Sequence, residues 1–332
     1  AASIGQVHRA RTHDGRDVAV KVQYPGVDAA ITADLGTAGT LFRGMAMVYP
    51  GLDPGPVVAE LQARLVEELD YLHEAANQRR FAEWYTGHPF IHVPAVLDEL
   101  TTRRVLTSEL AGGVRFDEVL SWPQHQRDAA GEAIFRFVFR SIYRLHAFNG
   151  DPHPGNYLFH RDGRVTFLDF GLVKYFTDEE TDLFASMIRA IVLQRDPAMF
   201  RVAVERAGLL PSGLPFSDAD VAEYFSAFYE LVRSPEVKRV DGAYASELVR
   251  RTFDASGPYG PIMKTANVPR AFVIIQRINL GLVAVLAQLG ATANWRLIAE
   301  ELWPWVHGPP STALGRREAD WLAERDAAPN PR

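Results

Sequence analysis

Two short acidic motifs, separated by a predicted β-hairpin, constrain the fold of this chain more than any other feature. In the first motif Asp151 precedes Asn156 by five residues, and the second is an Asp-Phe-Gly triplet that opens with Asp169. Between them Arg161-Asp162-Gly163 supplies a turn, because glycine readily takes the positive φ that tight hairpin turns need. A hairpin over residues 157–168 brings the two motifs to one edge of a sheet.

This arrangement suits phosphoryl transfer, which needs oxygen ligands for Mg²⁺ and a carboxylate beside the acceptor. Protein kinases place a catalytic aspartate at this same distance before a metal-binding asparagine, and a second metal-binding aspartate opens their Asp-Phe-Gly triplet. The spacing predicts Asp151 as the acid that orients the acceptor, and Asn156 and Asp169 as Mg²⁺ ligands. Either motif alone is common in ordinary turns, and a loop histidine such as His153 usually makes hydrogen bonds only. Together, in this order, they indicate a nucleotide site.

The N-terminal residues predict a small sheet that carries the lysine such a site needs. Residues 6–10 and 17–22 alternate as strands do, and His13-Asp14-Gly15 between them predicts a hairpin. Lys21 ends the sequence Val-Ala-Val-Lys on the second strand. A lysine on such a strand can reach the α- and β-phosphates of a nucleotide.

The segment before this hairpin occupies the position of a phosphate-covering glycine loop. When Val7 is aligned with the valine that closes such loops, Gly5 falls on the last glycine. Ala2 then stands where a glycine is expected, next to Ser3. Because a methyl group restricts the backbone, we expect this loop to cover the nucleotide differently from an ordinary kinase loop.

The lysine needs a carboxylate partner, and a helical periodicity over residues 56–84 supplies candidates. Glu67, Asp70 and Glu74 recur at i, i+3 and i+7, which places them on one face of a continuous helix. The alternative interpretation is that this acidic face is simply solvated.

A break at Ala111-Gly112-Gly113 predicts two lobes. We expect residues 1–110 to form a small sheet lobe, which further strands over 92–97 and 104–110 complete. Residues 111–307 are expected to form a larger helical lobe, with a core-facing stripe over 129–148. Residues 308–332 are rich in proline, glycine and charge, which predicts a disordered tail. The fold class predicted is α+β, with the two lobes of a protein-kinase-like fold.

Composition excludes several classes of site. The net charge is −6 and basic residues occur at most in pairs along the sequence, which argues against a nucleic-acid-binding protein. The chain has no cysteine, which excludes disulfides, thiolate metal sites and cysteine nucleophiles. The uncharged stretch over 278–295 is continuously apolar only from Leu282 to Ala287, which favours a buried or interfacial helix over a membrane span.

With these motifs in place, the chain resembles the UbiB/ADCK (aarF-domain) family of atypical, protein-kinase-like proteins, which are implicated in quinone biosynthesis and lipid homeostasis. The matching segments are the alanine-type loop over 1–8, the segment over 21–26, the acidic segment over 68–77 and the motifs of Asp151 and Asp169. The resemblance covers about residues 1–175 and is looser beyond them.

The resemblance implies a role for each matched residue. Lys21 pairs with Glu74, Glu68 and Asp70 form the family's own Glu-x-Asp motif, and His153 lies in the family's loop motif. The remaining implied roles are nucleotide contacts by Ala2, Ser3, Gly5 and Val7, an adenine-contacting hinge at Glu109-Leu110, catalysis by Asp151, and metal binding by Asn156 and Asp169. The cofactors implied are ATP and Mg²⁺.

The family also carries a helical extension with a Lys-x-Gly-Gln motif before the alanine loop, and some members carry a transmembrane anchor. Because this chain starts inside the loop, we expect the domain to lack that regulatory extension. Nothing in the sequence argues for export, and we expect a cytoplasmic protein with peripheral, reversible membrane contact.

The function that the sequence favours is an atypical kinase or ATPase with a small-molecule or lipid acceptor, such as a quinone precursor. After Gly171 the chain runs within a few residues into Thr177-Asp178-Glu179-Glu180, which predicts a helix N-terminus. No long activation segment or Ala-Pro-Glu motif follows, which argues against an ordinary protein kinase. Two alternatives stay open: a non-catalytic nucleotide- or lipid-binding regulatory module, and a phosphotransferase of the aminoglycoside or choline kinase type.

Overall fold

The computed structural model describes residues 4–27, 69–149, 152–253, 257–267 and 269–327. These residues form two compact units, and neither unit is continuous in sequence. The first comprises Ala1–Thr86, His92–Gly112 and Phe167–Leu172, and the second comprises Gly87–Ile91, Gly113–Thr166 and Val173–Arg332. The Asp-Phe-Gly triplet therefore belongs to the N-terminal sheet unit, although it lies far along the chain. The predicted α+β fold class is confirmed, with one unit built on a sheet and one that is mainly helical.

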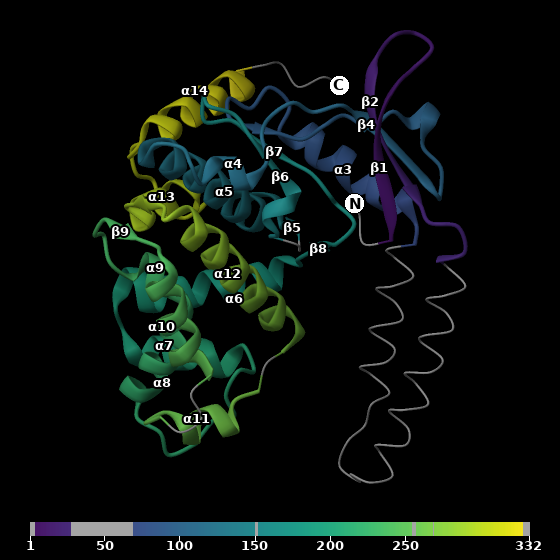
Figure 1. Cartoon of the computed structure of the whole chain (residues 1–332). Helices are drawn as coiled ribbons and strands as arrows, with labels where there is room; N and C mark the ends of the chain where they lie inside the picture. Colours follow the sequence, from purple (N-terminus) through teal and green to yellow (C-terminus); the bar gives the residue numbers. More distant parts are fainter. Residues whose placement is uncertain (1–3, 28–68, 150–151, 254–256, 268, 328–332) are drawn as a thin grey trace. The chain divides into compact units, whose positions relative to one another are not determined.

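The first unit is built on an antiparallel sheet of order β1-β2-β4, in which β1 is Gly5–Arg11, β2 is Asp17–Gln23 and β4 is Val105–Glu109. Figure 1 shows these strands side by side, with helix α3 (Tyr71–Trp84) next to them. The predicted hairpin is confirmed, because β1 and β2 pair from Gly5↔Gln23 to Arg11↔Asp17. Gly15 closes it with a φ of 90°, as the turn requires.

The prediction of one helix over residues 56–84 is wrong at Asp70. Asp70 is extended, and its side chain accepts a hydrogen bond from Leu72 N (3.0 Å), so it is the N-cap of α3. The N–H of Tyr71 is donated to the carbonyl of Arg103 (3.1 Å), which is not a bond within a helix. Capping and pairing with the chain before β4 thus end the helical run that periodicity predicted.

The predicted strand pair of 92–97 with 104–110 forms only in part. Strand β3 is limited to Ile91–His92, and residue Val96 makes a single bridge to Ser108. Two backbone hydrogen bonds flank this bridge, from Leu97 N to Thr107 O (2.9 Å) and from Glu109 N to Ala95 O (2.8 Å). A short 3-10 helix, η1 (Asp98–Leu100), follows Val96–Leu97 and turns the chain back toward β4.

The second unit is mainly helical (Figure 1). Its strands and 3-10 or π segments are β5 (Ala147–Asn149), η2 (Pro154–Asn156), β6 (Tyr157–Phe159), β7 (Val165–Phe167), β8 (Val173–Tyr175), η3 (Arg189–Gln194), η4 (Ala227–Tyr229), β9 (Lys238–Arg239) and β10 (Thr292–Ala293). Its helices are α4 (Phe116–Val119), α5 (Gln124–Leu145), α6 (Asp178–Ile188), α7 (Pro197–Arg206), α8 (Asp218–Ser226), α9 (Glu230–Arg233), α10 (Gly242–Phe253), α11 (Gly260–Thr265), α12 (Arg270–Leu289), α13 (Trp295–Leu302) and α14 (Ala313–Ala327).

Helix α5 provides the predicted core-facing stripe of this unit. Ile134, Phe137, Val138 and Ile142 are all buried, as their helical spacing predicts. The helix ends at His146, which takes a left-handed conformation (φ 49°). The predicted hairpin of β6 and β7 and the predicted helix start at Thr177 are both present, the latter with a full capping box.

The prediction of a disordered tail over 308–332 is wrong for residues 313–327, which form α14. Leu314, Glu318 and Trp321 are buried at helical spacing. Glu318 accepts hydrogen bonds from Arg136 (2.8 Å), Arg140 (2.6 Å) and His88 (3.2 Å). The charged composition that suggested disorder instead includes a buried carboxylate whose partners lie more than 170 positions earlier in the chain.

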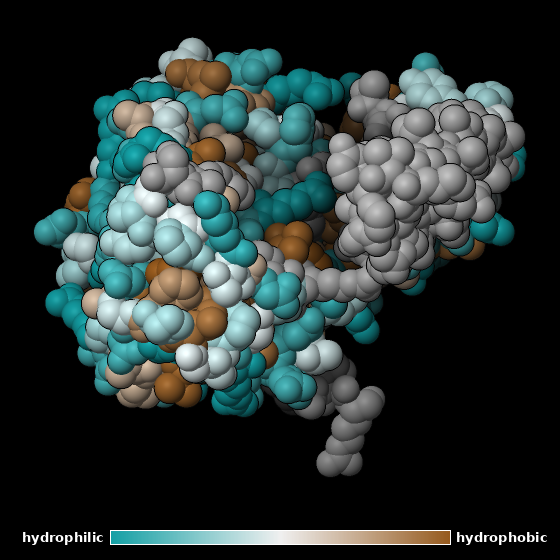
Figure 2. Space-filling model, turned by 90° about the horizontal axis from the view of Figure 1, so that it is seen from below, coloured by the Kyte–Doolittle hydropathy of each residue, from teal (hydrophilic) through white to brown (hydrophobic). Residues whose placement is uncertain are grey.

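The apolar segment Leu282–Ala287 lies in α12 and is mostly core. Leu282, Val283, Val285 and Leu286 are buried, and they offer little surface to a membrane. Within the described chain, Phe272–Leu289 of α12 is long and apolar enough to cross a membrane, and 39% of it is buried. The face of the helical unit turned to the viewer in Figure 2 carries hydrophobic residues in small groups among hydrophilic ones.

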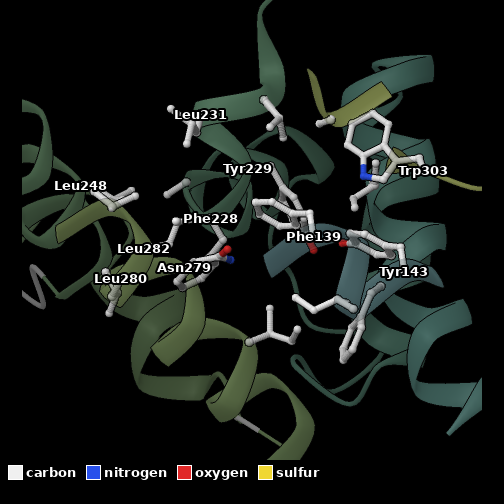
Figure 3. Close-up of a pocket in the computed structure, with 18 of the residues that line it drawn as sticks. Phe139, Tyr143, Phe228, Tyr229, Leu231, Leu248, Asn279, Leu280, Leu282 and Trp303 are labelled. Atoms are coloured by element: carbon white, nitrogen blue, oxygen red, sulfur yellow. The ribbon is translucent and has the colours of Figure 1, made fainter. Parts of the chain in front are cut away.

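Helices α5, α6 and α12 enclose a narrow apolar cavity of about 40 Å³. Figure 3 shows Phe139 and Tyr143 of α5 and Tyr229 of η4 pointing into the same space. Burial raises the pKa of the Tyr143 and Tyr229 phenols, so both stay neutral donors. The cavity has room for a few water molecules and not for a large ligand.

Candidate functional site

Lys21 and Glu74 form the centre of the charged cluster in the first unit. Lys21 Nζ lies 2.7 and 2.8 Å from the two carboxylate oxygens of Glu74. The side chains are 15% and 6% exposed. The Nζ also lies 5.0 Å from the centroid of the Tyr71 ring, a cation–π distance. The pairing that the family resemblance implied is therefore present, and it joins strand β2 to helix α3.

Asp169 is the third member of this cluster. Its Oδ2 lies 3.7 Å from Lys21 Nζ, and its side chain is 39% exposed. Its backbone is left-handed (φ 63°), a conformation that aspartate tolerates better than most residues. Its Oδ1 accepts a hydrogen bond from Gly171 N (3.2 Å). The carboxylate is thus oriented by its own turn and faces the lysine.

Two residues of α3 that the sequence did not single out anchor the Asp-Phe-Gly triplet. The Asn77 side-chain amide donates to the carbonyl of Phe170 (3.0 Å) and is itself buried. The Phe170 ring packs against Phe81, with centroids 5.0 Å apart. Asn77 and Phe81 follow Glu74 by three and seven positions, so all three share one face of the helix. The helical spacing of Asn77 and Phe81 from Glu74 is the sequence signal that could have identified these two residues.

Burial and the neighbouring charges together shift the pKa values of Lys21 and Glu74. Burial alone would lower the pKa of Lys21, but Glu74 and Asp169 outweigh it and raise the pKa above its ordinary range. Burial raises the pKa of Glu74, and the Asp169 charge adds to the rise, while Lys21 opposes it. Lys21 is therefore firmly charged at neutral pH, and the cluster carries two carboxylates for one ammonium group.

Gly5 and Val7 lie on the same sheet face as Lys21. Val7 pairs directly with Lys21 in the ladder, and Gly5 follows the same alternation. Val7 is 51% exposed, which is unusual for a valine at the centre of a strand. A Cβ on Gly5 would meet Val22 O at 2.3 Å and the Tyr71 hydroxyl at 2.7 Å. Close packing at the start of β1 therefore requires glycine there.

The predicted hinge Glu109-Leu110 lies at the end of β4. Glu109 donates its N–H to Ala95 O (2.8 Å), and Leu110 donates its N–H to Asp17 O (3.3 Å). The Glu109 carboxylate lies 3.6 Å from His92 Nε2. Because both backbone donors are already used, any adenine contact here would have to use other atoms of the segment.

Asp70 is placed differently from the prediction. As the N-cap of α3 it does not share a helix face with Glu74, and its carboxylate lies 3.6 Å from the Arg103 guanidinium.

The loop of the first motif lies in the second unit. His153 caps the 3-10 turn η2, and its Nδ1 accepts a hydrogen bond from Gly155 N (3.0 Å). Asn156 ends that turn and its N–H is donated to His153 O (2.9 Å). A Cβ on Gly281 of α12 would lie 2.3 Å from the Pro152 ring. The sequence analysis missed Gly281, which lets the loop pack directly on α12.

The predicted site residues thus divide into three groups. Lys21, Glu74 and Asp169 form one cluster in the first unit, on whose sheet Gly5 and Val7 also lie. Asn156 and His153 belong to the second unit. Ala2, Ser3, Glu67, Glu68 and Asp151 lie outside the described residues. Among the described residues, no three histidine, aspartate or glutamate side chains converge to hold a metal ion.

Comparison with known proteins agrees with this geometry. The model of the ABC1 atypical kinase-like domain matches residues 1–202. The rat protein named "Atypical kinase COQ8B, mitochondrial" is 37% identical over 191 residues, which are 57% of this chain and 36% of that protein. An Arabidopsis thaliana aarF domain-containing protein kinase (At1g71810, chloroplastic) is 31% identical over 304 residues, 89% of this chain and 42% of its own length. The chain thus spans less than half of either relative.

A solved structure extends the similarity to most of the chain. The structure of Rv3197 from Mycobacterium tuberculosis in complex with erythromycin is 33% identical, with a TM-score of 0.78. The match covers 93% of this chain and 77% of that one.

Proposed function

Because this chain belongs to the ABC1 atypical kinase-like family, we propose that it binds MgATP and either hydrolyses it or transfers a phosphoryl group to a small acceptor. The observation that carries the proposal is the Lys21–Glu74–Asp169 cluster. A lysine held by a helix carboxylate, with the Asp-Phe-Gly aspartate 3.7 Å away, is the arrangement that active protein kinases need in place.

In this proposal each residue has a defined role. Lys21 binds the α- and β-phosphates, and Glu74 positions it. Asp169 and Asn156 supply oxygen ligands to Mg²⁺, and Asp151 orients the acceptor. The donor set fits the ion: Mg²⁺ prefers oxygen, takes one or two carboxylates from the protein, and completes its shell with phosphate oxygens and water. The Asp169 carboxylate is partly exposed and shares one ammonium group with Glu74, so it retains negative charge that can bind Mg²⁺.

The sheet face around Lys21 supports a nucleotide on the same side. Val7, exposed and opposite Lys21 in the ladder, can cover the adenine or ribose. We assign the adenine contact to Glu109-Leu110 at the end of β4, and contacts with the phosphates to Ala2 and Ser3. Because Gly5 is required for packing, its contribution to phosphate approach is secondary.

The described chain after the triplet supports a small acceptor. Gly171 is followed by β8 and, from Asp178, by α6, so few residues are available for a peptide-binding platform. We propose a small-molecule or lipid acceptor, such as a quinone precursor, with a role in quinone biosynthesis or lipid homeostasis. Peripheral membrane contact belongs to the same proposal, and it rests on the family resemblance and not on the buried segment of α12.

One observation favours a second candidate, a non-catalytic binding module. The solved relative is in complex with erythromycin, and it covers nearly all of this chain. In that case MgATP or a macrolide would bind without turnover. Steady-state measurement of ADP release from MgATP distinguishes the two candidates directly.

The test of the nucleotide site is calorimetric titration of MgATP into the parent, Asp169→Asn and the exposed control Asp320→Asn. Loss of the carboxylate is expected to weaken MgATP by about tenfold, or 1.4 kcal/mol, and to reduce the dependence on Mg²⁺. Asp320→Asn removes the same charge from α14 and is expected to bind as the parent does. Equal affinity of Asp169→Asn and parent in excess Mg²⁺ would overturn the assignment.

A further inference from the structure

The helical unit contains an open cleft of about 670 Å³ that the nucleotide site does not use. Its volume is in the range of small-molecule sites and far exceeds the 40 Å³ of the apolar cavity. Helices α7 to α10, which surround it, lie near one another in Figure 1. We call it the basic cleft, and its charged and hydroxyl lining consists of Arg195, Arg233, Lys238, Arg251, Glu223, Glu230 and Ser234.

The charges that line the basic cleft do not balance. Four basic side chains face two carboxylates, which leaves an excess of two positive charges in a chain whose net charge is −6. Glu223 accepts a short hydrogen bond from Arg251 (2.6 Å), and Glu230 one from Lys238 (3.3 Å). Arg233 donates from Nη1 to Ser226 Oγ (2.9 Å), but it lies 3.7 and 3.6 Å from the two carboxylates, beyond good hydrogen-bonding distance. Its fork of N–H donors is therefore only partly used.

Arg195 is held at the edge of the cleft by an unusual backbone. It follows the π-helical segment η3 and takes a left-handed conformation (φ 56°, ψ 39°). The next residue, Asp196, caps α7 by accepting from Ala198 N (2.9 Å) and Met199 N (3.0 Å). Among the described residues Arg195 has no hydrogen bond or ion pair to its side chain. Its guanidinium is thus available to a ligand.

We propose that the basic cleft binds a phosphate-bearing anion, either a soluble phosphoryl compound or the headgroup of an anionic lipid. Guanidinium groups bind phosphate through paired N–H donors, and Arg195 and Arg233 both have such donors to give. Most of the lining lies at 219–251, beyond residues 1–202 that the family model matches. None of the residues that line the basic cleft is among those proposed for the MgATP site.

The test is calorimetric titration of inorganic pyrophosphate at low ionic strength with EDTA, using the full chain. Arg195→Asn removes the charge and keeps a residue that tolerates the left-handed backbone; Arg195→Gly is the second variant should Asn fold poorly. The matched control is Arg206→Asn, an exposed arginine at the end of α7 with the same charge change. Lys21→Met reports on any binding at the nucleotide site.

The expected result is saturable binding that Arg195→Asn weakens about tenfold and that Arg206→Asn and Lys21→Met leave unchanged. Sedimentation with phosphatidylcholine vesicles, with and without phosphatidylglycerol, distinguishes the sources. Loss of anionic-vesicle binding in Arg195→Asn assigns the headgroup, and pyrophosphate binding alone assigns a soluble ligand. The proposal is overturned if neither probe binds, if Lys21→Met and not Arg195→Asn abolishes binding, or if Arg206→Asn weakens it equally. None of these outcomes depends on MgATP binding.

Discussion

The lysine–carboxylate cluster of the first unit and the arginine–carboxylate cluster of the second differ in how many cationic side chains their carboxylates share. In the first, Lys21 is shared between Glu74 and a partly exposed Asp169. In the second, Arg136 has no exposed side-chain surface and is within 2.8 Å of carboxylates on three helices. Those carboxylates are Glu132 of α5, Glu301 of α13 and Glu318 of α14.

The pKa directions follow from this difference. Burial alone would raise the pKa of Glu318, but the hydrogen bond from His88 and the charges of Arg140 and Arg136 hold it far below its ordinary range. The pKa of Glu74, by contrast, is raised, because one shared lysine does not compensate for its burial and for Asp169. The arginine–carboxylate cluster fastens α14 to the core. The lysine–carboxylate cluster is partly exposed at Asp169, so its negative charge is available for a cation.

The largest expected effect comes from breaking the arginine–carboxylate cluster. Glu318→Ala leaves Arg136 and Arg140 buried with fewer partners, and removal of one member of a buried pair costs about 3–5 kcal/mol. The measurement is the free energy of unfolding in urea. The control is Glu324→Ala, an exposed glutamate of the same helix, with an expected change below about 0.5 kcal/mol. Similar values for the two variants would mean that α14 is not held by its buried charge.

The next effect concerns the lysine–carboxylate cluster, whose importance is expected in turnover more than in folding. Lys21→Met should reduce MgATP turnover by about a hundredfold, the usual loss on removing one preorganised electrostatic contact. Lys264→Met, an exposed lysine of α11, is the control and should turn over as the parent does. Steady-state kinetics with an unfolding curve for each variant give both quantities. A turnover loss matched by complete unfolding would contradict the functional assignment.

The pH dependence of the free energy of unfolding should have opposite signs for Glu318 and for Glu74. The Glu318 carboxyl has a depressed pKa when folded, so its contribution is fully present above about pH 4.5 and is lost as the pH falls below that value. We expect the difference between parent and Glu318→Ala to shrink by about 1 kcal/mol per pH unit below pH 4.5. Glu74, whose pKa is raised, should show the reverse trend in Glu74→Gln. Urea titrations of the parent and both variants between pH 3 and pH 7 measure the two trends. If the stability differences of the two variants change with pH in the same direction, the expected contrast between Glu318 and Glu74 is wrong.

The smallest effect is expected at an exposed ion pair. Arg103 and Asp70 are 3.6 Å apart, and the arginine side chain is 72% exposed. Arg103→Ala should change the free energy of unfolding by no more than about 0.5 kcal/mol, because solvent screens such pairs. A change above 2 kcal/mol in the same urea assay would show that pairing at the start of α3 matters as much as burial does.

The sequence by itself predicted the elements whose signals are local. The β1–β2 hairpin, the α5 core stripe, the β6–β7 hairpin and the cap at Thr177 each follow from a turn residue or a periodicity within about 20 positions. The pairing of Lys21 with Glu74 came from the family resemblance, because an acidic helix face alone does not say which carboxylate faces the sheet. The placement of residues 167–172 in the N-terminal unit had no local signal at all.

Only the tertiary structure decided the rest. The helix start at Asp70 depends on a hydrogen bond to Arg103, more than 30 positions away, and helical periodicity continues across it. The order of α14 depends on buried arginines of α5, so its charged composition was misleading. Glycines such as Gly5 and Gly281 matter because another segment packs against them. A sequence records local preference, whereas burial and pairing across the chain decide where a charge or a missing side chain is needed.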